Sequence, residues 1–117
     1  MHIIPWMTER NDLVFRALAN PSRRLLLDKL FEDDGQTLGA LCEGLRMTRQ
    51  AVTQHLAALE AASLIVTVWH GREKLHYLDT VPIRDLADRL HDNVSFGWPA
   101  TMSVMKTLVE AAEEAAG

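Results

Sequence analysis

Apolar residues recur every three or four positions along the first half of the chain, which predicts a series of helices. The first helix should cover about residues 8–19, with Thr8 as its N-cap. The second should begin at Asn20 and Pro21, because asparagine is a good N-cap and proline suits the first helical position. It should end near Gly35, since glycine can take the left-handed conformation that closes a helix.

Two threonines mark the starts of the next two helices. Thr37 can cap a short helix over residues 38–45, and Thr48 can cap a longer one that runs to about Ala62. The apolar positions of the longer helix are spaced by four and three residues, so they form one stripe that should face the core. This stripe consists of Val52, Leu56 and Leu59.

The hydrophobic period then changes from helical to two. Residues 64–69 are rich in β-branched side chains and residues 74–78 alternate again, which predicts a β-hairpin with a four-residue connection over residues 70–73. A fifth helix should run from Val81 to about Asn93, and a last helix should follow from about Pro99.

Taken in order, these elements are the parts of a winged helix-turn-helix: mainly α, with five to six helices and a two-stranded wing. In such folds the second helix of the motif enters the major groove of DNA, where its N-terminal residues reach base edges. Arginine can bond guanine with two hydrogen bonds, and glutamine can do the same with adenine. We therefore expect base readout from Arg49, Gln50, Thr53 and Gln54. We expect phosphate contacts from Thr48, His55, Arg72 and Lys74.

Composition supports one folded domain over residues 1–117. The order of the charged residues also places positive charge on one segment. The chain is 48% apolar and 24% charged, which is close to a globular average and argues against a disordered or fibrous protein. Its net charge of −4 argues mildly against nucleic acid. However, the stretch from Arg46 to Ala58 holds two arginines and no acidic residue. That stretch should form a cationic surface on an acidic protein.

The single cysteine, Cys42, excludes an intramolecular disulfide and fits a reducing cytosol. No apolar run approaches the ~20 residues needed to span a bilayer. The first residues lack the basic start and long apolar stretch of a signal peptide. These features predict a cytoplasmic protein without a membrane partner.

Four motifs in the expected order make the sequence resemble the ArsR family of bacterial winged-helix transcriptional regulators, over about residues 13–92. They occupy residues 17–24, 48–56, 71–78 and 82–84. The resemblance implies a homodimeric, sequence-specific DNA-binding protein, usually a repressor relieved by a ligand or metal. It places the DNA-reading helix on residues 48–59.

The metal-sensing members of that family carry a Cys-x-Cys pair in the third helix, and here those positions are Thr37 and Gly39. Because soft metals need thiolate ligands, we expect no such site and no cofactor. Asp88, His91 and Asp92 share a face of the fifth helix but do not match the family's ligand spacing. We interpret them as a solvated polar face, with a metal site as the alternative. Cys42 is interpreted as a packing residue, which leaves a redox role open.

Both ends of the chain carry more apolar side chains than a small domain needs, so we expect residues 1–19 and a helix over residues 98–117 to form a homodimer interface. Its candidate residues are Ile3, Ile4, Trp6, Trp98, Met102, Met105, Leu108 and Val109. The alternative is that both ends fold back onto their own subunit.

The sequence favours a DNA-binding regulator that acts on an inverted-repeat operator. The resemblance implies that it is a repressor and that an unidentified small molecule can serve as its effector. No nucleophile–base arrangement and no phosphate-binding glycine loop occurs in the sequence, so an enzyme is not expected. The alternative is a winged helix that contacts other proteins and does not read DNA. It would keep the fold but would not need an acid-free polar face on the fourth helix.

Overall fold

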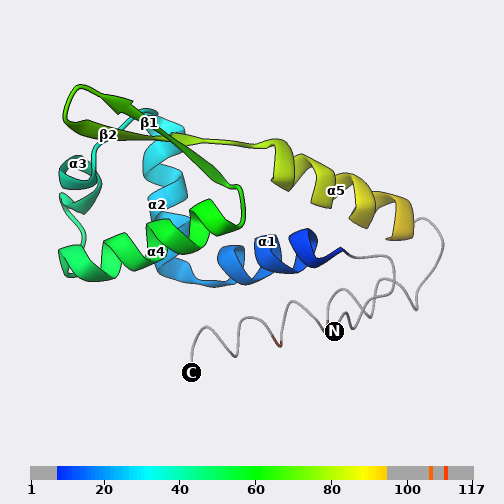
Figure 1. The fold of residues 1–117 in the computed structure, drawn as a ribbon. Coiled ribbons are helices and arrows are strands. Elements are labelled where there is room, and N and C mark those ends of the chain that lie inside the picture. The colour runs from blue at the N-terminus through cyan, green and yellow to red at the C-terminus, as the bar shows by residue number, and fades with distance from the viewer. Residues whose placement is uncertain (1–7, 95–105, 107–109, 111–117) are drawn as a thin grey trace.

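The predicted fold class is confirmed by a computed structural model, which describes residues 8–94 together with Lys106 and Glu110. The described part is mainly helical with one antiparallel hairpin (Figure 1). In chain order the elements are α1 (Glu9–Ala19), α2 (Pro21–Glu32), α3 (Leu38–Cys42), α4 (Arg49–Ala61), β1 (Ile65–His70), β2 (Glu73–Leu78) and α5 (Val81–Val94).

All four predicted N-caps are confirmed. The side chain of Thr8 accepts a hydrogen bond from the backbone of α1, and Asn20 accepts two from the start of α2. Thr37 accepts from the amide of Ala40 at 3.2 Å, and Thr48 accepts from the amide of Ala51 at 3.0 Å. Each cap satisfies an amide that the helix itself leaves without a partner, which is why the starts were readable from sequence.

Two predicted boundaries were wrong, both beside glycines. The third helix was expected to reach Leu45 but ends at Cys42, because Gly44 has a φ of +76° that an α-helix does not contain. The hairpin connection has two residues rather than four, since His70 pairs directly with Glu73. Gly71, with a φ of +64°, allows this tight turn.

The core lies where α1, α2 and α4 pack together, with α3, the hairpin and α5 closing its sides. The predicted stripe of α4 is confirmed, because Val52 and Leu59 are fully buried and Leu56 is nearly so. Leu26, Leu30 and other leucines from α2 and α3 complete the packing. The stripe thus fixes which face of α4 is left for solvent.

A buried polar contact joins α1 to α5. Asn11 is 1% exposed, and its side chain both completes the cap with Thr8 and donates to the carboxylate of Asp85 at 3.2 Å. Asp85 also pairs with Arg89 one turn later in α5 at 3.2 Å. Because a buried amide is costly without partners, these bonds hold the start of α1 against α5.

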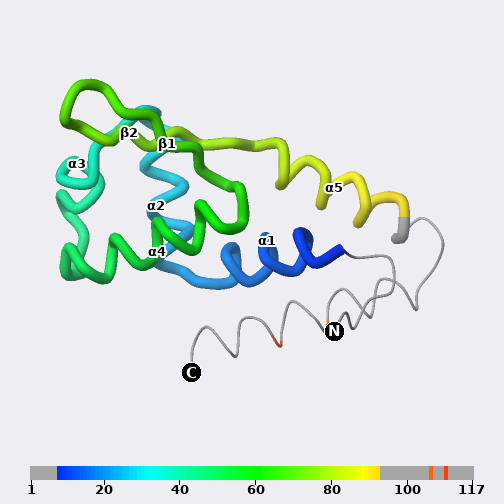
Figure 2. The backbone as a smooth tube through the Cα atoms, in the orientation of Figure 1, coloured from blue at the N-terminus to red at the C-terminus, as the bar shows by residue number. Residues whose placement is uncertain are grey.

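The wing is tied to the segment between α2 and α3, which runs beside β2 (Figure 2). The amides of Gly35 and Gln36 donate to the carbonyl of His76 at 2.9 and 3.2 Å, and the amide of His76 donates back to Gln36 at 2.8 Å. The amide of Leu78 donates to the carboxylate of Asp34 at 2.8 Å. This segment therefore forms an isolated antiparallel bridge with β2 and holds the wing against the helices.

Several predictions fall on residues whose structure is not described. The last helix expected from Pro99 lies outside the described residues, apart from Lys106 and Glu110. So do all the named dimer candidates, which are Ile3, Ile4, Trp6, Trp98, Met102, Met105, Leu108 and Val109.

We expect Gly35→Ala to destabilise the protein more than Gly44→Ala. Both glycines have a φ of +76°, so both substitutions carry the same left-handed strain, roughly 1–2 kcal/mol. Only at Gly35 would the new Cβ meet another group, the ring of Tyr77, at 2.9 Å, whereas nothing lies within 4 Å at Gly44. Urea unfolding of the two variants measures the difference. Equal losses of stability would contradict a close approach of Tyr77 to this turn.

Candidate nucleic-acid interface

A lysine from α2 holds the turn between α3 and α4. The ammonium group of Lys29 donates to the carbonyl oxygens of Ala40, Leu41 and Glu43 at 3.3, 3.1 and 2.6 Å. These carbonyls lie at the end of α3 and just beyond it, and the carbonyl of Ala40 also accepts from the amide of Glu43 at 3.3 Å. The contact fixes α3 and the following turn on α2, and so sets where α4 begins.

The outward face of α4 is polar and open. Thr48, Arg49, Gln50, Thr53 and Gln54 are all exposed, and no acidic residue lies in the first turn. The structure thus places these five predicted site residues, which belong to α4 and its cap, on the exposed surface of the helix. Their assigned contacts with bases or phosphates stay predictions.

Thr53 has a restricted hydrogen-bonding role. Its hydroxyl donates to the carbonyl oxygen of Arg49 at 2.9 Å, one turn back in the helix. The hydroxyl hydrogen is therefore occupied, while the oxygen can still accept and the methyl group stays available for apolar contact. Such a side chain suits a donor or a thymine methyl in the major groove.

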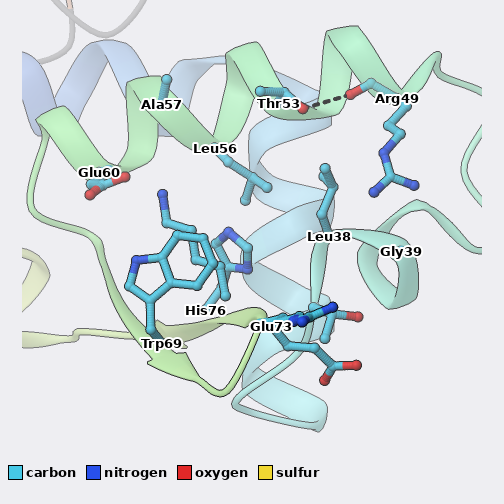
Figure 3. A pocket seen from close by; sticks show the side chains of 13 residues that line it. Leu38, Gly39, Arg49, Thr53, Leu56, Ala57, Glu60, Trp69, Glu73 and His76 are labelled. Atoms are coloured by element: carbon cyan, nitrogen blue, oxygen red, sulfur yellow. Dashed lines mark hydrogen bonds between the residues drawn. The ribbon is translucent and has the colours of Figure 1, made fainter.

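The wing faces α4 across a groove that Figure 3 shows from close by. Arg72 is exposed in the hairpin turn and Lys74 is half-buried at the start of β2. Trp69 pairs with Lys74 across the hairpin and is 68% exposed, beside the two predicted cations. The sequence pattern predicts only a strand at Trp69 and gives it no role at a site. An aromatic residue paired with a lysine near the tip of a predicted wing could have indicated that Trp69 belongs to the site.

His55 accepts a hydrogen bond from an arginine of α2. The Nε of Arg23 donates to Nδ1 of His55 at 3.3 Å, so the ring carries its hydrogen on Nε2 when neutral. Partial burial and the positive charge of Arg23 lower the pKa of His55 below its usual value. A neutral imidazole can offer one donor to a phosphate but no charge, while Arg23 beside it supplies the charge.

The polar face of α5 does not assemble a ligand cluster in the described residues. Asp88, His91 and Asp92 are exposed, and no group of three His, Cys, Asp or Glu side chains there is placed to hold a metal ion. Cys42 is a free thiol that packs against the core. Within the described ranges, no helix is long and apolar enough to cross a membrane.

Comparison with known proteins matches residues 18–68 to a helix-turn-helix domain family. The HTH-type transcriptional regulator YuzN of Bacillus subtilis is 34% identical over 86 residues, which cover 68% of this chain and 94% of that protein. The crystal structure of an ArsR family transcriptional regulator matches with a TM-score of 0.68 and 25% identity, covering 75% of this chain and 90% of that one.

The chain belongs to the ArsR family. As a member of this family it is a helix-turn-helix transcriptional regulator that binds DNA. A third relative, the transcriptional repressor SdpR of Bacillus subtilis, is 31% identical over 72 residues, which cover 62% of this chain and 79% of that protein. In this ArsR-family chain, α3 and α4 are the helix-turn-helix and the hairpin is the wing.

We expect Arg23→Met to raise the pKa of His55, because it removes the nearby positive charge and the hydrogen bond to Nδ1. The value should stay below normal, since burial is the larger cause of the shift. An NMR titration of the His55 ring measures it, with Arg24→Met on the same helix as control. An unchanged pKa in Arg23→Met would contradict the contact.

The same shift predicts how stability depends on pH. Because His55 has a lowered pKa in the folded state, the unfolded chain binds its proton first as pH falls. The His55 contribution to stability should therefore be complete above the usual imidazole pKa and should decline as pH falls towards the lowered one. This loss of stability at low pH should be smaller in Arg23→Met, because the pKa of His55 lies closer to its usual value there.

Proposed function

We propose that the protein is a homodimeric, sequence-specific repressor that binds an inverted-repeat operator in double-stranded DNA. The observation that carries this proposal is the exposed, acid-free face of α4, capped by Thr48 and flanked by a wing with Arg72 and Lys74 at its tip. A helix can lie in the major groove while a wing reaches the neighbouring backbone or minor groove. Repression is inferred from the resemblance to the repressor SdpR.

Residues divide into two roles under this proposal. Four residues in the first two turns of α4 read bases: Arg49, Gln50, Thr53 and Gln54. Those at the edges hold phosphates: Thr48, His55, Arg72 and Lys74, with the charge of Arg23 beside His55. The division follows from chemistry, because arginine and glutamine can each make two hydrogen bonds to one base edge, whereas the cations of the wing and single donors such as a hydroxyl suit phosphate oxygens.

An apolar groove between α1 and α5 supports dimerisation. It has a volume of about 410 Å³ and is lined mainly by Phe15, Leu18, Ile83, Leu86 and Leu90. A second copy that covers this groove, together with the apolar chain ends, would remove it from water. A two-fold dimer would place two copies of α4 in successive major grooves, ~34 Å apart.

A winged helix that contacts other proteins, without reading DNA, is the alternative. The exposed side chains of α4 favour DNA over that alternative, since the centres of protein-binding surfaces are enriched in aromatic residues and the exposed face at the start of α4 has none. Retention on duplex DNA at low salt, despite the net negative charge, distinguishes the two. Selection of bound sequences from a random DNA pool then gives the half-site and its spacing.

We expect Arg49→Ala to weaken binding to the selected operator by about 1–3 kcal/mol and to relax the preference at one base position. Random-sequence DNA should be bound with a much smaller loss, because a base contact adds little there. Fluorescence anisotropy with both duplexes measures the ratio. Equal losses on operator and random DNA would show that Arg49 does not read a base.

Lys74→Ala is the matched control for this variant. A phosphate contact should be lost evenly on operator and random DNA, and the slope of log affinity against log salt should fall by about one. A change of base preference in Lys74→Ala would contradict its assignment to the backbone.

We expect a dimer at micromolar concentration that becomes monomeric, or aggregates, when residues 98–117 are removed. Leu90→Glu should also weaken the dimer, because it places a charge in the α1–α5 groove. Leu25→Glu is the control, since Leu25 is 52% exposed on α2 and does not line that groove. Light scattering measures the mass. A truncated protein that stays dimeric with unchanged DNA affinity would contradict this interface.

A further inference from the structure

The groove between α4 and the wing holds a buried polar group that the proposed DNA contacts do not use. The groove has a volume of about 540 Å³, and its apolar walls include Leu38, Leu56, Ala57 and Trp69 (Figure 3). His76 of β2 also lines it and is only 4% exposed. Figure 3 shows the ring of His76 between Trp69 and Leu56.

The hydrogen bonding of His76 fixes which ring nitrogen carries the hydrogen. Nδ1 lies 2.9 Å from the carbonyl oxygen of Gln36, which can only accept. Nδ1 is therefore the donor, and Nε2 of the neutral ring is an acceptor. No described residue donates to Nε2. A buried acceptor without a partner is unfavourable, so this atom is available to a ligand that brings a donor.

The rest of the lining defines what such a ligand looks like. The indole of Trp69 and the aliphatic side chains favour a flat apolar body. Cations at Arg49, Arg72 and Lys74 outnumber the carboxylates of Glu60 and Glu73, which favours an anionic group. The volume lies within the range of small-molecule sites, ~300–1,000 Å³.

We infer that this groove binds a small aromatic molecule that carries a hydroxyl group and an anionic group. The hydroxyl donates to Nε2 of His76, the ring packs against Trp69 and Leu56, and the anion faces the basic residues of the wing. The backbone of a DNA strand does not meet the same requirement, because a phosphodiester and a deoxyribose within the strand have no hydrogen to donate to Nε2.

The consequence for regulation rests on the proposed function. Arg49, Thr53, Arg72 and Lys74 line the groove and also belong to the proposed DNA-contacting set. A molecule bound there would therefore occupy the space between α4 and the wing and exclude DNA directly. No conformational change would have to pass to a distant site.

Binding is tested on the full chain without DNA, using 6-hydroxy-2-naphthoate and 2-naphthoate in calorimetric titrations. These probes differ only in the hydroxyl group. We expect the hydroxy compound to bind about tenfold more tightly, since its hydroxyl satisfies the buried acceptor. Equal affinities would overturn the role given to His76.

Two variants locate the site. His76→Asn keeps a donor that can reach the Gln36 carbonyl but removes the Nε2 acceptor, so it should abolish the preference for the hydroxy compound. Trp69→Ala should weaken the binding of both probes by a similar factor. Because Trp69 is exposed, this variant should keep the fold. Binding that neither variant alters would place the probe in another groove and overturn the inference.

Competition with operator DNA separates this inference from the proposed function. Displacement of the duplex by 6-hydroxy-2-naphthoate, lost in Trp69→Ala, supports both. Probe binding that leaves the DNA complex intact would overturn direct exclusion of DNA while the binding site stands. DNA binding without any probe binding would overturn the site and leave the proposed function standing.

Discussion

Paired backbone between the α2–α3 segment and β2 holds the wing in a fixed relation to the helix-turn-helix. Gln36 and His76 exchange hydrogen bonds through their backbones, and the imidazole of His76 adds a further bond to the same Gln36 carbonyl. The side chain of Gln36 also donates to two carbonyls, those of Lys29 and Asp33. A two-stranded hairpin by itself is only marginally stable in water, so it needs such an attachment. The distance between α4 and the wing tip depends on this junction.

The same junction helps to form the groove between the wing and α4. Because Nδ1 of His76 is used to hold the wing, its other nitrogen is left facing the space beside Trp69 and Leu56. Nδ1 of His76 thus helps to hold the wing, and in the proposed site Nε2 accepts a hydrogen bond from the ligand. Under the proposed function, the surfaces for DNA and for a small molecule overlap, so regulation requires only that one exclude the other.

The positions of the charged residues matter more here than the net charge of the chain. The chain carries a net charge of −4, yet the start of α4 has no acidic side chain and the wing tip has two cations. The buried stripe of α4 makes this possible, since it turns every polar residue near the start of that helix outward. Under the proposed function, the acidic excess in the rest of the sequence would limit non-specific attraction to DNA and would leave more of the affinity to contacts made by α4 and the wing.

What the sequence determined by itself was local. The caps at Thr8, Asn20, Thr37 and Thr48, the stripe of α4 and the change to a two-residue period each depend on neighbours within a few positions, so their physical causes can be read from the chain. Tertiary structure decided the contacts between distant residues. Gln36 and His76 are 40 positions apart and Arg23 and His55 are 32 apart, and no local pattern indicates either pair. Tertiary structure also decided the early end of α3 and the two-residue wing turn. Gly44 and Gly71 can each adopt several backbone conformations, and only the surrounding packing selects one of them.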